Sequence, residues 1–400
     1  MRKRFRTRPG IGPSLSRKVA LVGAGMSVFG TRPETPRELF SEAFREAAAS
    51  VDRDFEPGQI EEAWIGSLAM GGYQLGNLGP FATESAGLAG IPVRRVENAC
   101  ASSGFALRDA YLAIRAGACD VALVGGLEKM NDLSKAHQRY WLGVSGDTEW
   151  ERMAGLTFPG TYALMAQRHM HEYGTTEDHL AAVAEKNHAN GALNPKAQFQ
   201  KPVAREKIRS SAYVCAPLRL FDCCSTTDGA SALILANEEH ARRLTDDPVW
   251  ILGSGAASDR LAVYERPSLT TLTASKTAAR DALQQSGLSL EGIDLAEVHD
   301  CFTIAEILAL EDLGFCAKGQ GGPFSESGAT RRDGKRPVNP SGGLKAKGHP
   351  LGATGAAQAY EVFKQLRGQA GDRQVAGAQS ALTHNVGGSG ASCVVHVFGR

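Results

Sequence analysis

The chain has 400 residues, 42% of them hydrophobic, which is enough to bury a large core in two domains or in one fused pair. Its formal net charge is +1, but residues 1–18 hold seven basic side chains and no acidic one, so the remaining residues carry −6. This balance argues against a nucleic-acid-binding body. No apolar stretch has the length of a membrane span or the pattern of a secretory signal, so we expect a soluble cytoplasmic protein with no membrane partner.

The basic leader, residues 1–18, is rich in arginine but contains prolines and glycines and lacks an amphipathic apolar stripe. We therefore predict a disordered extension rather than an organelle-targeting segment. The eight cysteines are unevenly spaced and include no pair of CxxC motifs, which argues against a disulfide framework and against a structural zinc site. Each cysteine is therefore interpreted as either core packing or a reactive thiol.

Strands and helices alternate in both halves of the chain. Early in the chain, the apolar patterns predict a buried strand at 18–27, a helix at 36–51 and a second strand at 60–67. The same three elements are predicted again at 249–258, 273–287 and 293–300. Alternation of this kind favours α/β architecture, and a repeat of about half the chain is typical of two similar halves packed as one body. We expect the functional site between the halves.

We place the N-terminal half at 19–245 and the C-terminal half at 246–400. Within the first half, a stretch of weak strand signal at about 131–215 is interpreted as an insertion.

The first strand ends in a glycine-containing segment that suggests a dinucleotide-binding fingerprint. Gly23 and Gly25 fit that fingerprint, but Val28 occupies the place of the third glycine, and no acidic residue follows at the usual distance. A dinucleotide cofactor is therefore not expected.

Cys100 lies between an apolar approach and the segment "ASSGFALRDAYLAIRAGACD", whose apolar residues have helical spacing. The cysteine is therefore predicted at a strand-to-helix turn, where the positive end of a helix dipole favours a thiolate. Its small neighbours leave room for a substrate. A lone cysteine is more often core packing, so a catalytic role requires a nearby base.

Three further polar clusters provide candidate partners. His349 lies in a stiff Gly- and Pro-rich loop before a helix, His299 and Cys301 follow a predicted strand, and His384 precedes a glycine run. The carboxyl ends of strands are where ligands bind in open α/β sheets, so the clusters indicate one pocket. A zinc site is the alternative, but none of these residues has the short spacing that metal sites favour.

Four segments in this order resemble the signatures of the thiolase family: "NACASSGFAL", "VALVGGLEKM", "DGASALILA" and "GHPLGATG". Two departures resemble the sterol-carrier-protein-type thiolases and the archaeal-type acetyl-CoA acetyltransferases. The chain has "HDCF" at 299–302 where many thiolases have NEAF, and His384 in "HNVGGSG" where they have a second catalytic cysteine. A third departure is Cys224, at a position where many thiolases place a serine near the pantetheine arm of coenzyme A.

The resemblance implies the thiolase fold, with two βαβαβ-based halves in a five-layer α-β-α-β-α arrangement and a loop insertion in the first half. It implies reversible Claisen condensation or thiolysis of coenzyme A thioesters through an acyl-cysteine. Cys100 would be the nucleophile, His349 its base and Cys301 the proton shuttle. His299 and His349 would stabilise the enolate oxygen, and His384 would position the substrate or Cys301.

The resemblance also implies further coenzyme and oxyanion contacts. The backbone N–H of Cys100 and one from the Val386 to Gly388 run would form a second oxyanion site. The candidate substrate and coenzyme A contacts are Val386, Gly387, Gly388, Met165, Cys224 and Ser341.

The implied ligands are acetyl-CoA and 3-ketoacyl-CoA, with no permanently bound cofactor and no metal. The implied partners are further copies of the chain, as a homodimer or tetramer, and in addition a small OB-fold zinc-ribbon protein and a hydroxymethylglutaryl-CoA synthase. Alternative interpretations are a ketoacyl synthase, an acyltransferase with another acceptor, a related steroid side-chain aldolase and a non-catalytic lipid-carrying subunit. Retention of the cysteine in "HDCF" favours a thiolase over a synthase, and retention of Cys100 argues against the aldolase.

Overall fold

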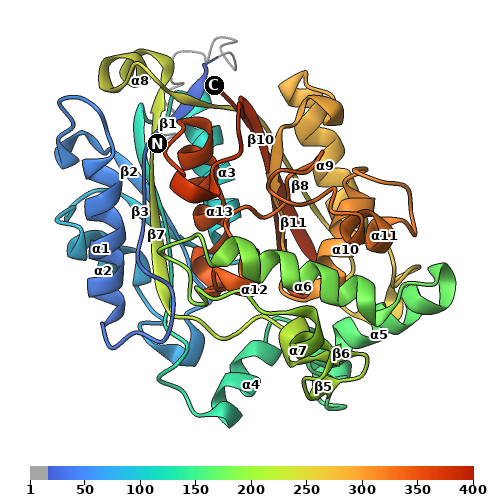
Figure 1. Ribbon diagram of the computed structural model, residues 1–400. Coiled ribbons are helices and arrows are strands. Elements are labelled where there is room, and N and C mark those ends of the chain that lie inside the picture. The colour runs from blue at the N-terminus through green and yellow to red at the C-terminus, as the bar shows by residue number, and fades with distance from the viewer. Residues whose placement is uncertain (1–16) are drawn as a thin grey trace, which may run out of the picture.

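The computed structural model describes residues 17–400, so most of the predicted leader lies outside the described residues. Nine strands form one sheet in the order β3-β2-β4-β7-β1-β8-β11-β10-β9 (Figure 1). The strands of this sheet are β1 (Val19–Met26), β2 (Glu62–Gly66), β3 (Val93–Val96), β4 (Val121–Glu128), β7 (Gly229–Asn237), β8 (Val249–Ser258), β9 (Leu295–Glu297), β10 (Ser380–Gly387) and β11 (Ser392–Gly399).

The two halves of the sheet repeat one another, as the sequence predicts. In the first half β2 runs parallel to β4, followed by antiparallel β7 and β1; in the second, β9 runs parallel to β10, followed by antiparallel β11 and β8. The halves join edge to edge through a short antiparallel pairing of β1 with β8, in which Ala20 pairs with Trp250 and Leu21 with Val249. The repeat therefore builds one continuous sheet.

Helices cover both outer faces and fill the space between the halves. The helices are α1 (Pro36–Ala49), α2 (Leu78–Ser85), α3 (Ser102–Arg115), α4 (Lys135–Gly143), α5 (Phe158–Tyr173), α6 (Glu177–Gly191), α7 (Arg205–Arg209), α8 (Glu238–Leu244), α9 (Thr273–Ser286), α10 (Thr303–Asp312), α11 (Gly321–Glu326), α12 (Gly343–Ala346) and α13 (Thr354–Leu366). Helix α1 packs on β1 and β7, and α9 packs on β8 and β11. Helices α3 and α13 pack against each other and against strands of both halves, which gives the five layers expected from the resemblance (Figure 1).

The two central helices occupy equivalent places in the repeat. Helix α3 precedes β4, and α13 precedes β10, the strand that corresponds to β4. Cys100 lies just before α3 and His349 lies shortly before α13. The repeat therefore brings the candidate nucleophile and the candidate base to the N-terminal ends of two neighbouring helices.

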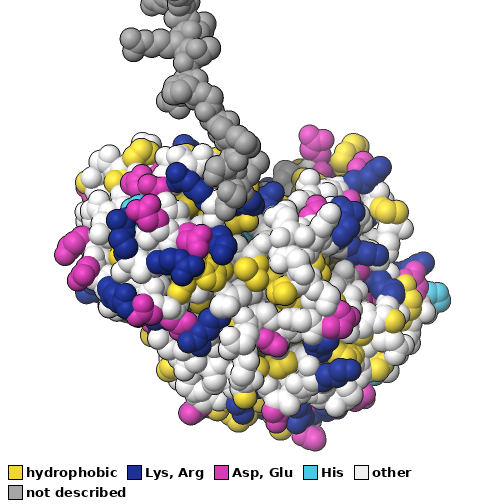
Figure 2. Space-filling view, turned by 90° about the horizontal axis from the view of Figure 1, so that it is seen from above, with side chains coloured by type: hydrophobic (Ala, Val, Ile, Leu, Met, Phe, Trp, Pro, Cys, Tyr) yellow, Lys and Arg dark blue, Asp and Glu magenta, His cyan; other side chains and the backbone are white. Residues whose placement is uncertain are grey.

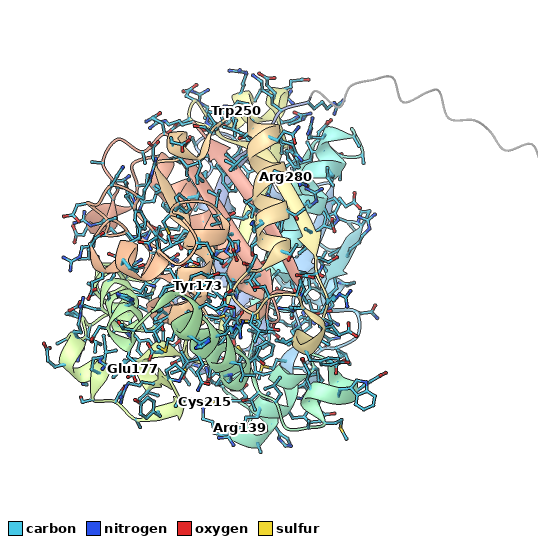
Figure 3. The ribbon with its side chains drawn as sticks, turned by 90° about the vertical axis from the view of Figure 1, so that its right-hand side faces the viewer. Arg139, Tyr173, Glu177, Cys215, Trp250 and Arg280 are labelled. Atoms are coloured by element: carbon cyan, nitrogen blue, oxygen red, sulfur yellow. The ribbon has the colours of Figure 1, made fainter. Side chains whose placement is uncertain are left out.

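Helices α4 to α7 and a small hairpin of β5 (Tyr213–Cys215) and β6 (Leu218–Arg219) lie between β4 and β7 in the chain. This segment contains the predicted insertion. It covers one end of the sheet, where Figure 3 shows Arg139, Glu177 and Cys215 far from Trp250 at the opposite end. The insertion therefore covers the end of the sheet at which the site is expected.

The described surface mixes charges of both signs. In the view of Figure 2, acidic and basic side chains alternate over the face, and no large area carries a single sign. Within residues 17–400, no helix combines the length and the apolar character needed to cross a membrane.

Candidate active site

A strained turn presents Cys100 at the start of α3. Ala99 has φ of +49°, in the left-handed region that non-glycine residues rarely adopt. Its N–H donates to a Glu97 carboxylate oxygen at 2.6 Å, and the Ser102 hydroxyl donates to its carbonyl at 2.6 Å. Such strain persists only where the surroundings enforce it, which is typical of functional positions. The turn therefore confirms the predicted location of Cys100 before a helix.

His349 is held in the tautomer that a base requires. Its Nδ1 lies 2.7 Å from the Thr354 hydroxyl, and that hydroxyl donates its only proton to the carbonyl of Pro350 at 2.9 Å. Thr354 must therefore accept a hydrogen bond from Nδ1–H, which leaves the lone pair on Nε2. The backbone N–H of His349 donates to the Thr227 hydroxyl at 2.9 Å and fixes the loop.

His299 is held in the opposite tautomer. The Asn385 amide nitrogen donates to the carbonyl of Cys100 at 3.0 Å and lies 3.2 Å from Nδ1 of His299. Since that nitrogen is a donor, Nδ1 accepts and the proton of His299 is on Nε2. This Nε2 is buried and has no hydrogen-bond partner among the described residues. The rings of His299 and His349 meet edge to face, with centroids 5.1 Å apart.

Cys100 lies close to both of these imidazoles. The Cys100 thiol and one ring nitrogen of each histidine are all within 4.8 Å of one another. A thiol and two imidazoles are also ligand types that zinc accepts. No metal site is expected from the sequence, because these residues lack the short sequence spacing that metal ligands favour. The fold nevertheless brings them together from three separate segments. Their opposite tautomers suit proton transfer, with an acceptor and a donor close to the thiol.

Burial controls the protonation of this cluster. It raises the pKa of the Cys100 thiol well above its ordinary value, with a further contribution from Cys224. Burial also lowers the pKa of His349 to about 3 and holds that of His299 well below its usual range. Burial therefore opposes the ready ionisation of the thiol that was predicted from the helix dipole.

Two backbone N–H groups face the Cys100 sulfur. The N–H groups of Gly388 and of Cys100 itself form hydrogen bonds that lower the thiol pKa, against the larger effect of burial. Gly388 has φ of +60° and follows the end of β10. Within the predicted Val386 to Gly388 run, the N–H that faces the Cys100 sulfur is therefore that of Gly388. Val386 packs in the apolar core beside Cys393.

Cys301 lies on the same cluster and contacts Tyr162. The Cys301 thiol and the Tyr162 hydroxyl share a hydrogen bond, and that hydroxyl donates to the carbonyl of Gly388 at 3.3 Å. Cys224 and Cys100 both act to raise the pKa of Cys301, although burial is the largest cause. Tyr162 stacks on Phe302 with ring centroids 4.6 Å apart. The predicted proton shuttle is therefore close to the predicted nucleophile.

His384 holds the backbone of His299 rather than Cys301. It lies within β10, which continues to Gly387, so it does not follow a strand end as predicted. Its Nδ1 accepts from the backbone N–H of His299 at 3.4 Å, and its Nε2 lies 2.8 Å from the Ser275 hydroxyl. Both ring nitrogens are therefore engaged, which leaves a positioning role.

The remaining residues predicted to contact substrate or coenzyme A differ in their distance from the Cys100 cluster. Cys224 belongs to the cluster, because its backbone N–H donates to the carbonyl of Cys301 at 3.0 Å. Met165 is fully buried in the apolar cluster that includes Cys301. Ser341 is turned away to Glu297, to which its hydroxyl donates at 2.6 Å, so its contacts do not support coenzyme binding. A Cβ on Gly387 would meet the carbonyl of Asn98 at 2.4 Å, so this glycine permits close packing.

Several residues that build the site are not predicted by the sequence. Asn385 is adjacent to His384 but belongs to no pattern that indicates a role, and Tyr162 and Thr354 have no sequence signal that sets them apart. Glu128, at the end of β4, is buried and accepts backbone hydrogen bonds from Leu68, Met70 and Gly352 at 2.7 to 3.0 Å. A buried glutamate at the end of an apolar strand was the one available signal.

The chain matches two family models that together cover most of it. The model "Thiolase, N-terminal domain" matches residues 19–239, and "Thiolase C-terminal domain-like" matches residues 255–400. The acetyl-CoA acetyltransferase of Methanothermobacter thermautotrophicus is 45% identical over 391 residues, which cover 96% of this chain and 100% of that protein. Sterol carrier protein 2 of Bos taurus is 37% identical over 394 residues, which cover 95% of this chain and 72% of that protein.

Solved structures share the fold. The chain of an Ltp2-ChsH2(DUF35) aldolase superimposes with a TM-score of 0.82 at 26% identity, over 97% of this chain and 99% of that one. Human mitochondrial 3-ketoacyl-CoA thiolase in complex with CoA superimposes with a TM-score of 0.73 at 17% identity, over 97% and 98%. The chain therefore belongs to the thiolase family, as its signature segments predict. It is an acyltransferase of the thiolase class.

Proposed function

We propose that this thiolase catalyses reversible Claisen chemistry between acetyl-CoA and 3-ketoacyl-CoA, with acetyl transfer as its main reaction. The name of the 45% identical relative supports this choice of substrate. The observation that carries the mechanism is the pair of opposite tautomers around Cys100: Nε2 of His349 is free to accept a proton, and Nε2–H of His299 is free to donate one.

In the thiolysis direction, the Cys100 sulfur attacks the 3-keto carbon while its proton passes to Nε2 of His349. Because burial opposes both the thiolate and the imidazolium, we infer that proton transfer and carbon–sulfur bond formation proceed together. The oxyanion of the tetrahedral intermediate accepts hydrogen bonds from the backbone N–H groups of Gly388 and Cys100.

Carbon–carbon cleavage then releases acetyl-CoA as its enolate. The enolate oxygen accepts hydrogen bonds from Nε2–H of His299 and from the newly protonated His349, and Cys301 delivers a proton to the α-carbon. The His349 imidazolium then gives its proton to the Cys301 thiolate, so both groups are neutral again before the second half-reaction. The sulfur of coenzyme A attacks the acyl group on Cys100 while its thiol proton passes to Nε2 of His349, and His349 returns that proton to the Cys100 sulfur as the new thioester leaves. Condensation is the reverse sequence.

A largely apolar cavity of about 920 Å³ lies between the insertion and the second half, and its lining does not include Cys100, His299, Cys301 or His349. Its lining includes Val263 and Leu269, which pack against the apolar cluster of Tyr162 and Cys301, and the exposed rings of Trp150 and Tyr264. We propose that the acyl-CoA approaches Cys100 over this face.

Assembly and partners are also proposals. The aldolase that shares the fold includes a DUF35 protein, which supports a small OB-fold zinc-ribbon partner for this chain. We propose a homodimer or tetramer of the chain itself. Association with a hydroxymethylglutaryl-CoA synthase and a cytoplasmic location stay predictions from the resemblance.

The test is exchange of the acetyl-CoA methyl protons with deuterated solvent, followed by mass spectrometry. The wild-type enzyme is expected to thiolyse acetoacetyl-CoA and to catalyse this exchange. Cys301→Ala is expected to lose exchange while still forming the acyl-enzyme. Undiminished exchange in Cys301→Ala would remove Cys301 from the mechanism, and absence of thiolysis in the wild type would refute the proposed function.

A further inference from the structure

One buried lysine differs from the others in what it pairs with. Lys129, Lys186 and Lys347 are buried and each lies within ion-pair distance of a carboxylate. Lys345 is equally buried, at 3% exposure, but within residues 17–400 its ammonium has no such carboxylate. Instead its Nζ donates a hydrogen bond to the backbone carbonyl of Cys223. Asp222 and Asp300 act on its charge only from beyond ion-pair distance. A buried cation with no carboxylate in direct contact costs stability, so its presence here needs a reason.

Both ends of Lys345 are anchored to the active-site segments. The Asp300 carboxylate accepts from the backbone N–H of Leu344 at 2.6 Å and from that of Lys345 at 3.3 Å. The tip of the side chain holds the carbonyl of Cys223, and the next residue, Cys224, donates its N–H to the carbonyl of Cys301 at 3.0 Å. The lysine thus links the segment that carries Cys224 to the segment that carries Cys301, and we call this link the Lys345 brace.

The brace matters because Cys224 contributes to the reactive cluster. Cys224 is near enough to raise the pKa values of both Cys100 and Cys301. A shift of the 223–225 segment would therefore move one wall of the space around the nucleophile.

Lys345 lines a cavity of about 560 Å³. His188, Phe199, Phe221 and Cys223 are among its lining residues. Both ring nitrogens of His188 lack partners among the described residues, and the charge of Lys345 helps to lower the pKa of His188 to about 3. A small cation from solvent can therefore reach the place of the ammonium if the side chain is shortened.

We propose that Lys345 is a positioning residue whose tethered ammonium fixes the 223–225 segment and thereby sets affinity for the thioester substrate. This inference rests on the proposed function for its kinetic readout. Lys345 touches no reacting atom and acts through Cys223 and Cys224.

The first test is kinetic. Lys345→Ala leaves the Cys223 carbonyl buried and unpaired, so KM for acetoacetyl-CoA is expected to rise by about tenfold. kcat is expected to change less than KM, because Cys100, His349 and Cys301 keep their own contacts. Lys345→Met, which keeps the volume of the side chain but has neither charge nor donor, is expected to show the same rise in KM.

Chemical rescue separates this role from general destabilisation. Methylammonium is expected to restore the KM of Lys345→Ala, because it supplies a charged N–H donor to the vacated place. It is not expected to rescue Lys345→Met, in which that place is filled. Tetramethylammonium, which carries the charge but no N–H donor, is expected to fail with both variants.

An unchanged KM in Lys345→Met overturns the proposal, as does equal rescue by methylammonium and tetramethylammonium. If Lys345→Ala does not fold, Lys345→Met alone decides. Hydrogen exchange of the peptide 220–226 provides a readout without turnover: faster exchange in the variants supports the brace, and unaltered exchange refutes it. Loss of thiolysis in the wild type would instead refute the proposed function and leave this exchange measurement as the test of Lys345.

Discussion

The chemistry of the site depends on which atom of each histidine carries its proton. Thr354 fixes the proton of His349 on Nδ1, and Asn385 fixes the proton of His299 on Nε2. Both rings are neutral, because burial lowers their pKa values. The thiol close to them is also neutral for the same reason. In such a neutral triad, charge develops only when a substrate carbonyl is bound and its oxygen can accept the negative charge.

The tautomer of His349 can be tested at Thr354. Thr354→Val keeps the shape but removes the hydroxyl that accepts from Nδ1–H, so the imidazole is no longer fixed as a base. We expect kcat for thiolysis to fall by about 100-fold, the lower range of what a positioned acid or base contributes. Thr354→Ser keeps the hydroxyl and is expected to retain most of the activity. Equal activity in the two variants would contradict the assignment.

Close approach of the central helices sets the geometry at the level of elements. Gly104 in α3 has no room for a side chain, since a Cβ would meet Oδ1 of Asn385 at 2.6 Å and Cγ1 of Val394 at 2.7 Å. Asn385 is the residue that joins Cys100 to His299. The packing of α3 on the second half of the sheet and the orientation of the catalytic groups therefore depend on the same contact.

Gly104→Ala tests this dependence. Alanine favours a helix by about 1 kcal/mol over glycine, but crowding in a packed core costs about 1–3 kcal/mol and displaces Asn385. We expect a net loss of unfolding free energy in urea and a fall in kcat. Gly58→Ala is the control, because a Cβ at Gly58 meets nothing within 4 Å. A Gly104→Ala enzyme with wild-type stability and kcat would show that the contact is dispensable.

The sequence predicts the helices and strands better than it predicts the contacts among them. The strand predicted at 249–258 and the helix at 273–287 match β8 and α9 closely, because hydrophobic periodicity depends on local spacing. Cys100, His299, His349 and Cys301 were foreseen from strand ends and family signatures. The roles of Thr354 and Lys345 were not, since they depend on hydrogen bonds between residues far apart in the chain.

The whole molecule buries these groups between two similar halves. Helices α3 and α13 form a layer that touches strands of both halves, so the site lies at the ends of helices that are buried between them. The same burial that shapes reactivity also affects stability. His188, His349 and His384 have pKa values lowered to about 3, and that of His396 is lowered to about 4.

Burial of these histidines predicts an acid-sensitive contribution to stability. A histidine with a lowered folded-state pKa binds protons in the unfolded state first, so stability is full above the unfolded pKa of about 6.5 and is lost as pH falls below it. Each such histidine contributes a slope of up to about 1.4 kcal/mol per pH unit. Asp300, whose pKa is raised to about 7, acts in the opposite direction. The buried carboxyls of Glu128, Asp222, Glu297 and Asp312, whose pKa values are also raised by burial, act in the same direction as Asp300.

Urea unfolding at a series of pH values between neutrality and about 4.5 measures this slope. We expect each buried histidine to contribute a decrease in unfolding free energy as pH falls over that range. His188→Gln, which removes one titrating group outside the catalytic cluster, is expected to reduce the slope. An equal slope in the wild type and in His188→Gln would contradict the neutral state of His188 in the folded protein.

The central claim is that Cys100 carries an acyl group between two half-reactions. Incubation with acetoacetyl-CoA in the absence of free coenzyme A, followed by peptide mass spectrometry, tests it directly. We expect one acetyl group on the peptide that contains Cys100 and none in Cys100→Ala. An acetyl group on Cys224 or Cys301 instead, or turnover by Cys100→Ala, would contradict it.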